Sequence, residues 1–142
     1  MDADVCERIT KMADVGEGDV FYDLGSGDGR VVIAAAMKGA KAYGVEMDKL
    51  RVWYSRAWIK LLRLDKQAEI IHGDIFETDL SKATVVCTYL LQETNDKLQG
   101  KLERELKPGT RVISVAFEYK GWKPTKTDLR GTIYGPIMLY EI

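Results

Sequence analysis

The feature that most restricts how this chain can fold is a glycine-rich segment between an apolar run and a helical pattern. The segment reads DLGSGDGR over residues 23–30, and the apolar run before it covers residues 20–24. Glycine has no Cβ, so a backbone with glycine at alternate positions can turn sharply and let a ligand approach closely. A strand, a glycine-rich turn and a helix in this order are typical of the first unit of a parallel α/β sheet.

The rest of the chain alternates short apolar runs with longer helical patterns. Strands are predicted at 20–24, 42–46, 69–72, 84–88, 111–117 and 137–142. Helices are predicted at 31–38, 49–64 and 95–106. This order predicts one α/β domain over residues 1–142, with a doubly wound, mostly parallel sheet and helices on both faces. In such sheets ligands bind at the carboxyl ends of the strands, where the strand order reverses.

The predicted helix 49–64 has a cap and an apolar pattern of its own. Asp48 is placed to cap its first turn. Apolar side chains at spacings of three and four predict the buried face, namely Leu50, Trp53, Ala57, Leu61 and Leu64. The same helix carries a set of cations that we interpret as a solvated face rather than a nucleic-acid surface, namely Lys49, Arg51, Arg56, Lys60 and Arg63.

Composition and charge narrow the classes of partner. The chain has 142 residues, 46% of them hydrophobic and 30% charged, with a formal net charge of −1. Without a basic excess, a membrane surface is not expected as partner, and a nucleic acid is disfavoured but stays open because a local basic patch can hide in a neutral total. No signal peptide and no apolar run near the ~18 residues of a membrane span is found, which predicts a cytoplasmic protein. Cys6, Cys87 and the only histidine, His72, form no zinc pattern, so no metal site is expected.

The charges around the glycine-rich turn indicate what kind of ligand it binds. Asp23 and Asp28 flank the turn, and its glycines follow the pattern G-x-G-x-G rather than the dinucleotide pattern G-x-G-x-x-G. Two carboxylates repel a pyrophosphate, so a ligand with an amino group and a sulfonium and without phosphate fits better. A plain glycine-rich turn is the alternative interpretation.

Two later loops end at the same predicted edge of the sheet. Glu46 follows Gly25 at about the 20-residue separation at which an acid reaches the ribose hydroxyls of an adenosine ligand. Asp74 can accept a hydrogen bond from an adenine amine, and Ile75 can cover the adenine ring. The alternative for Glu46 is a solvated loop acid, and the alternative for Asp74 is an ordinary Gly-Asp turn. The predicted cofactor-binding residues are Asp23, Gly25, Ser26, Gly27, Asp28, Gly29, Glu46, Met47, Asp74 and Ile75.

Together these three loops resemble those of class I S-adenosylmethionine-dependent methyltransferases. The resemblance extends from Val20 to the C-terminus, and its first motif is FYDLGSGDGR. It implies a seven-stranded sheet whose final strand pair is antiparallel. It also implies S-adenosylmethionine as cofactor and S-adenosylhomocysteine as product.

A narrower resemblance rests on DLGSGDGRVVIAAA, on Tyr89-Leu90-Leu91, and on KLERELKPGTRVIS with FEYKGWKP. These segments are similar to the small archaeal protein-lysine methyltransferases, whose eukaryotic relatives are mitochondrial enzymes that methylate proteins of energy metabolism. The resemblance implies methyl transfer to lysine ε-amines, so that proteins bearing lysine are the expected partners.

The acceptor mouth is expected beyond the strand predicted at 84–88. Tyr89 is the first catalytic candidate, because its ring can line a lysine channel and its hydroxyl can orient the amine; Thr88 is the second. A tyrosine simply packed at the strand end is the alternative. Glu118, Tyr119 and Trp122 are expected near the same edge.

Other functions remain open on the sequence alone. A methyltransferase acting on RNA or on a small molecule is the main alternative to a lysine substrate. A cofactor-binding subunit without catalysis is a second, against which the intact Asp23, Gly25, Gly27 and Glu46 argue. An NAD-dependent dehydrogenase is disfavoured by the glycine spacing.

Overall fold

The computed structural model of the chain describes residues 2–130 and 132–142. Its strands are β1 (Val20–Leu24), β2 (Lys41–Glu46), β3 (Ala68–His72), β4 (Val85–Thr88), β5 (Arg111–Val115), β6 (Lys126–Asp128) and β7 (Ile137–Glu141). Its helices are α1 (Ala3–Met12), α2 (Arg30–Met37), α3 (Lys49–Leu61) and α4 (Gln92–Glu105). No helix among the described residues is both long enough and apolar enough to cross a lipid bilayer.

The strands form one seven-stranded sheet in the order β3-β2-β1-β4-β5-β7-β6. Strands β1 to β5 pair in parallel, whereas β7 pairs antiparallel with both β5 and β6. The predicted fold is therefore confirmed, including the antiparallel final pair. The strand order reverses between β1 and β4, and this places the expected ligand site at the carboxyl end of β1.

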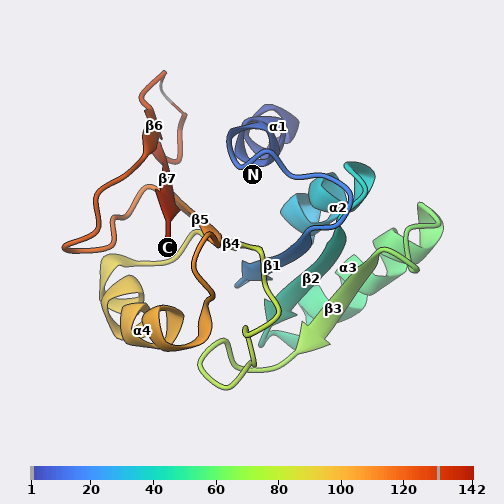
Figure 1. Ribbon diagram of the computed structural model, residues 1–142. Helices are drawn as coiled ribbons and strands as arrows, with labels where there is room; N and C mark the ends of the chain where they lie inside the picture. The colour runs from blue at the N-terminus through green and yellow to red at the C-terminus, as the bar shows by residue number, and fades with distance from the viewer. Residues whose placement is uncertain (1, 131) are drawn as a thin grey trace.

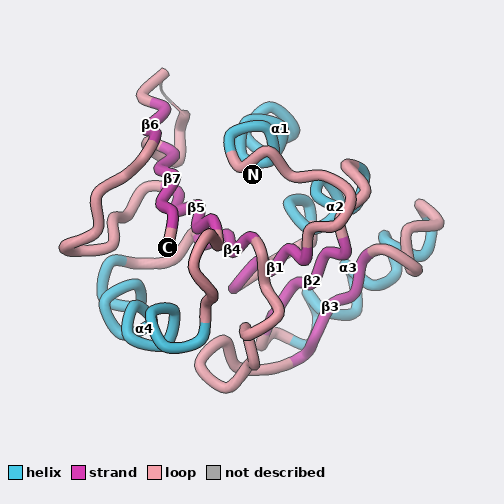
Figure 2. Tube along the Cα trace, viewed as in Figure 1, coloured by secondary structure: helices cyan, strands magenta, loops and turns pink. Residues whose placement is uncertain are grey.

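Helices cover both faces of the sheet (Figures 1 and 2). On one face, side chains of α1, α2 and α3 form a core with the sheet, with Ile9, Val32 and Ile59 among its members. On the other face, α4 and the segment 73–84 form a second core that includes Leu98 and Leu80. The sheet is thus buried on both sides, as the apolar runs of β1 and β4 require.

Three element boundaries differ from the sequence prediction by more than one residue: the start of α4, the end of β5 and the end of α3. Helix α4 begins at Gln92 instead of Asn95, after Leu91, which makes no side-chain cap hydrogen bond. Without a capping side chain, no sequence signal marks that start. Strand β5 ends at Val115 because Ala116 has φ 74°, a left-handed conformation that ends the strand.

The prediction for the buried face of α3 is wrong. The residues of α3 that face the core are Val52, Ser55 and Ile59. Leu50 and Leu61 are 77% and 81% exposed, and Trp53, expected in the core, is 72% exposed. The buried face is set by the close packing of the glycine-rich loop: a Cβ on Gly29 would lie 3.0 Å from Ser55 Cβ, so the loop requires a small residue there.

The C-terminal end of α3 also comes earlier than predicted. The helix ends at Leu61 instead of residue 64. Arg63 follows with φ 57°, and this left-handed residue turns the chain back towards β3. The cap at the other end is as predicted, since the Asp48 carboxylate accepts a hydrogen bond from Leu50 N at 2.9 Å.

Candidate functional site

The glycine-rich loop is fixed by hydrogen bonds to the neighbouring strand. Gly25 N and Ser26 N both donate to Val45 O of β2, at 2.8 and 3.0 Å. Gly25, Gly27 and Gly29 have φ of 82°, 57° and 87°. All three occupy the left-handed region that L side chains rarely adopt, which explains why the loop contains glycine at alternate positions.

The surroundings of the glycines show which side of the loop is open. A Cβ on Gly44 of β2 would lie 2.6 Å from Ser26 Oγ, so Gly44 lets the loop pack directly on the sheet. A Cβ on Gly27 would meet no described atom within 4 Å. Gly27 therefore presents bare backbone to open space.

That open space is a pocket of about 460 Å³ at the carboxyl ends of β1 and β4. Its lining combines the loop with the starts of α2 and α3 and the end of β4: Asp23, Gly25, Ser26, Gly27, Asp28, Arg30, Val31, Arg51, Cys87 and Tyr89. Five of the residues predicted to bind a cofactor line the pocket, and so does the predicted catalytic Tyr89.

Asp23 is a buried carboxyl group at the base of the pocket. Its side chain makes no hydrogen bond with another described residue, and the residue is 6% exposed. Burial raises its pKa to about 8, and the nearby carboxylates of Glu46 and Asp28 add to the rise. Near neutral pH the group is therefore mostly protonated, and a cation bound beside it stabilises the carboxylate.

Ser26 also has a polar atom without a partner, on the side of the loop that packs against Gly44. Ser26 Oγ is buried and makes no hydrogen bond within the described residues. A buried hydroxyl without a partner carries a free-energy cost, and a ligand in the pocket can remove that cost once the Ser26 side chain turns away from Gly44. An unpaired hydroxyl, an unpaired carboxyl group and bare glycine backbone fit a ligand that carries cationic and polar groups, as S-adenosylmethionine does.

Glu46, at the end of β2, links the loop to the start of α3. Its Oε1 accepts a hydrogen bond from Gly27 N at 2.8 Å, and its Oε2 accepts one from Asp48 N at 3.0 Å. Each carboxylate oxygen keeps a further lone pair, so these bonds leave acceptor capacity for a ribose hydroxyl. Glu46 does not itself line the pocket, although it holds the backbone of Gly27, which does.

The other predicted cofactor residues lie around the same edge of the sheet without lining the pocket. Gly29 precedes α2 and packs on Ser55. Met47 is 67% exposed. Asp74 accepts a hydrogen bond from Phe76 N at 2.9 Å, and Ile75 packs against the second core. Their roles in binding the adenosine remain predictions.

Tyr89 stands at the mouth of the pocket and is paired with a residue that the sequence analysis did not identify. It is 44% exposed, and its ring meets that of Tyr134 edge to face, with centroids 5.7 Å apart. Tyr134 lies between β6 and β7, where Thr132 Oγ1 accepts a hydrogen bond from its backbone N at 3.0 Å. No pattern in the sequence pairs these two tyrosines, because the sheet topology brings them together.

Thr88 is a core residue that does not line the pocket, and its catalytic role stays a prediction. It is completely buried, and its hydroxyl lies 3.0 Å from that of Tyr119. Side chains alternate along a strand, so Cys87 and Tyr89 line the pocket whereas Thr88 points to the other side.

Two further residues expected near the mouth belong to the second core. Tyr119 is 1% exposed, and its ring centroid lies 4.9 Å from that of Trp122. Burial raises the pKa of Tyr119 well above its usual range. Glu118 is exposed, and its carbonyl accepts a hydrogen bond from Gln92 Nε2 at 2.9 Å.

The pocket includes residues that the sequence analysis missed. Arg51 contributes to its wall from the first turn of α3, and Arg30 and Val31 do so from the start of α2. Gly44, which lets the loop pack, was also missed. A glycine inside a strand is a known sign of close backbone approach, so Gly44 was detectable.

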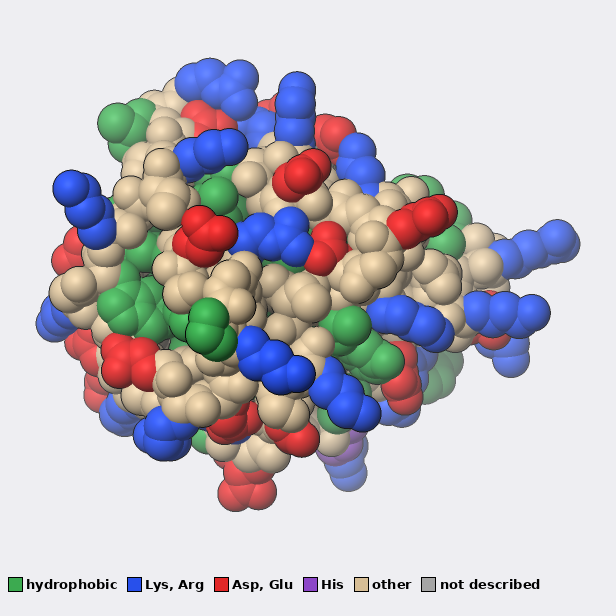
Figure 3. Space-filling model, viewed as in Figure 1, with side chains coloured by type: hydrophobic (Ala, Val, Ile, Leu, Met, Phe, Trp, Pro, Cys, Tyr) green, Lys and Arg blue, Asp and Glu red, His purple; other side chains and the backbone are tan. Residues whose placement is uncertain are grey.

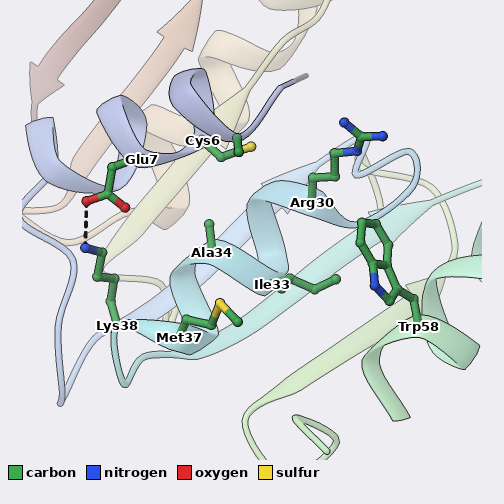
Figure 4. Close-up of a pocket in the computed structure, with 9 residues that line it drawn as sticks. Cys6, Glu7, Arg30, Ile33, Ala34, Met37, Lys38 and Trp58 are labelled. Atoms are coloured by element: carbon green, nitrogen blue, oxygen red, sulfur yellow. Dashed lines mark hydrogen bonds and ion pairs between the residues drawn. The ribbon is translucent and has the colours of Figure 1, made fainter. Parts of the chain in front are cut away.

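A second hollow of about 440 Å³ lies between α1, α2 and Trp58 of α3 (Figure 4). Its floor is apolar, with Ile33, Ala34 and Met37, and a 2.8 Å ion pair between Lys38 and Glu7 crosses one end. It shares only Arg30 with the pocket at β1 and β4. It contains neither the glycine-rich loop nor Tyr89, so it is not the site predicted from the sequence.

Within the described residues, no group of three or more His, Cys, Asp or Glu side chains is arranged to hold a metal ion. His72 lies at the exposed end of β3, where its Nε2 is 3.0 Å from Met47 O. The histidine therefore has a structural contact and lies outside the pocket lining.

Comparison with known families gives a match over most of the chain. Residues 23–126 match the family model described as the ANTKMT methyltransferase domain. A protein-lysine N-methyltransferase of Saccharolobus islandicus is 46% identical over 122 residues, which are 84% of this chain and 76% of that protein. The adenine nucleotide translocase lysine N-methyltransferase of Mus musculus is 34% identical over 117 residues, 79% of this chain. The chain spans about half the length of that mouse relative.

Comparison with solved structures gives a match over the whole chain. The crystal structure described as an RNA methyltransferase from Salinibacter ruber, in complex with S-adenosyl-L-homocysteine, has a TM-score of 0.94 and 42% identity. The match covers 100% of this chain and 92% of the other. The fold and a bound adenosyl product are thus found together in a similar protein.

Proposed function

The chain belongs to the ANTKMT methyltransferase domain family, and from this premise we propose that it methylates lysine ε-amines of proteins with S-adenosylmethionine as methyl donor. One observation carries the proposal: the bare backbone of Gly27, the unpaired carboxyl group of Asp23 and the ring of Tyr89 line the same pocket. The first two fit the cofactor, and the third lies where an acceptor amine enters.

The cofactor, when bound, supplies a methyl group on a positively charged sulfur. The residues that would hold it are Asp23, Ser26 and Gly27 in the pocket, with Glu46 fixing the loop. Asp23 balances positive charge in a buried setting, and Ser26 gains a hydrogen-bond partner. The loop is preformed by its bonds to Val45, so little backbone order has to be gained on binding.

The mouth has to accept a lysine side chain and favour its neutral amine, since a free lysine with a pKa of about 10.4 is protonated at neutral pH. Two aromatic rings, Tyr89 and Tyr134, provide an apolar wall that disfavours the charged form through desolvation. In the reaction a bond forms between the amine nitrogen and the methyl carbon while the carbon–sulfur bond breaks. The amine proton leaves to solvent, and the products are methyl-lysine and S-adenosylhomocysteine.

The test is incubation of the full chain with S-adenosylmethionine labelled in its methyl group and a cell lysate, followed by digestion and mass spectrometry. The proposal predicts label on lysine residues of proteins, and at least tenfold less label with the Gly27→Ala variant as control when the cofactor concentration is below its dissociation constant. Label recovered only in nucleosides or small metabolites would contradict a lysine substrate while leaving the methyltransferase assignment in place.

A second candidate function is methylation of RNA. It is favoured by the Salinibacter ruber structure, which is described as an RNA methyltransferase and matches the whole chain. The same experiment separates the two candidates, because the RNA fraction of the lysate is digested to nucleosides and analysed beside the peptides.

A further inference from the structure

Helix α3 presents an apolar row to solvent. Leu50, Trp53 and Leu61 are 77%, 72% and 81% exposed, and Tyr54 is 55% exposed. Their spacing of three, four and seven residues places them on one side of the helix, opposite the buried Val52, Ser55 and Ile59. The row continues at Met47, which is 67% exposed just before the helix.

Cations flank this row on both sides. Lys49, Arg51, Lys60 and Arg63 are exposed, whereas α3 itself contains no acidic residue. Lys49, Lys60 and Arg63 form no ion pair with another described residue, while Arg51 lies 3.9 Å from Asp48 at the helix start. Lys and Arg side chains project from the edge of the molecule where α3 ends, at the right of Figure 3.

From this arrangement we propose that α3 docks the protein onto an anionic lipid bilayer. An apolar row of leucine and tryptophan bordered by cations is the pattern by which amphipathic helices bind the membrane interface. Here the second, buried face of the helix packs on the protein, so the whole domain would be held at the surface. No membrane partner is expected from the sequence, because the cations of this helix are interpreted as a solvated face and its apolar row as the buried face, whereas Leu50, Trp53 and Leu61 are exposed.

The charges and the side-chain types argue for lipid over other occupants. A second copy paired through α3 would bring two sets of cations together, which costs free energy. Single-stranded RNA would use the cations and stack on Trp53, but it offers nothing apolar to cover Leu50 and Leu61. A bilayer with anionic headgroups satisfies both the cations and the aliphatic side chains.

Docking through α3 has a consequence for the site. Arg51 belongs both to this surface and to the wall of the pocket, so the pocket lies beside the docking surface. The proposal does not depend on the reaction, and binding to vesicles is measured without cofactor.

The test is co-sedimentation of the full chain with vesicles of phosphatidylcholine containing about 30% phosphatidylserine, beside vesicles of phosphatidylcholine alone. We expect binding to the anionic vesicles that weakens at least fivefold when salt rises from about 0.1 M to about 0.5 M. Leu61→Ser should weaken binding about tenfold, whereas Leu129→Ser, which changes a leucine of 77% exposure outside α3, should leave binding within about twofold.

A charge pair of variants provides the second arm. Lys60→Gln should lower the affinity for anionic vesicles about fivefold, whereas Lys107→Gln, which changes an exposed lysine beyond α4, should not. Absence of binding to anionic vesicles, or binding insensitive to both α3 variants, overturns the proposal. Two other results would also overturn the proposal. One is salt-dependent binding of a single-stranded oligoribonucleotide that is abolished by Trp53→Ala and by Lys60→Gln. The other is dimerisation, measured by sedimentation, that is abolished by Leu61→Ser.

Discussion

The buried carboxyl group of Asp23 makes cofactor affinity depend on pH. Without cofactor its pKa is about 8, raised first by burial and then by Glu46 and Asp28. The cofactor is positively charged, so it binds best to the carboxylate form and lowers the pKa of Asp23 in the complex. Below the pKa of about 8, binding must therefore release close to one proton.

The size of the effect follows from the fraction of Asp23 that is deprotonated. With a pKa of about 8, this fraction is about 0.3% at pH 5.5 and about 9% at pH 7. The dissociation constant of S-adenosylmethionine should therefore fall about 30-fold over that interval. The α-amino group of the ligand, with a reference pKa of about 7.7–8.0, stays mostly protonated throughout, so it does not produce this change.

The assay is isothermal titration calorimetry at several pH values, in two buffers that differ in their enthalpy of ionisation. Asp23→Asn is the control: it removes the titrating group and should bind weakly with little dependence on pH. A wild-type dissociation constant that changes less than about threefold between pH 5.5 and pH 7, without proton release, would refute the reasoning.

The remaining predictions concern stability and individual pocket residues. Because folding raises the pKa of Asp23, the contribution of this residue to stability is lost as pH rises from about 4 to about 8. The free energy of unfolding of the wild type should therefore fall by up to about 1.4 kcal/mol per pH unit in this range. Thermal unfolding of Asp23→Asn should lack this decline. Gly27→Ala should lower the free energy of unfolding by about 1 kcal/mol, and so should the control Gly109→Ala, because both glycines have positive φ and open space around them. Only Gly27→Ala should weaken cofactor binding, at least tenfold in calorimetry. Tyr89→Ala should slow single-turnover methylation about 10- to 100-fold, while Tyr89→Phe, which keeps the ring, should stay within about fivefold. Tyr119→Phe should lower unfolding free energy by about 1 kcal/mol through loss of its hydroxyl contact and leave methylation unchanged, as measured by chemical denaturation and the same rate assay.

Local sequence signals predicted the parts of the fold that are held by contacts between residues close together in the sequence. The bounds of β1 and the cap at Asp48 follow from local patterns, and the structure shows both. Gly25 and Gly27 line the pocket as predicted, because their left-handed φ and their place at the end of β1 are local properties. The cofactor followed from the charges beside that loop.

The predictions that the structure contradicts concern residues whose position is set by packing between segments distant in the sequence. The apolar residues that share a spacing on α3 do lie on one side of the helix, but that side is exposed. The opposite side packs on the protein, with Ser55 against Gly29, and no local pattern in the sequence indicates this. Thr88 was assigned to the mouth from its position alone, although the alternation along β4 turns it towards Tyr119. Tyr134 reaches Tyr89 only through the antiparallel return of β7, which no local pattern encodes.

The central claim is that the pocket at the ends of β1 and β4 holds the methyl donor. The most direct measurement is a crystal structure of the chain grown with S-adenosyl-L-homocysteine. The account predicts the nucleoside in the pocket lined by Asp23, Ser26, Gly27 and Tyr89, with a hydrogen bond to Ser26 Oγ. A nucleoside bound instead in the apolar hollow between α1 and α2, or no bound nucleoside at saturating concentration, would contradict it.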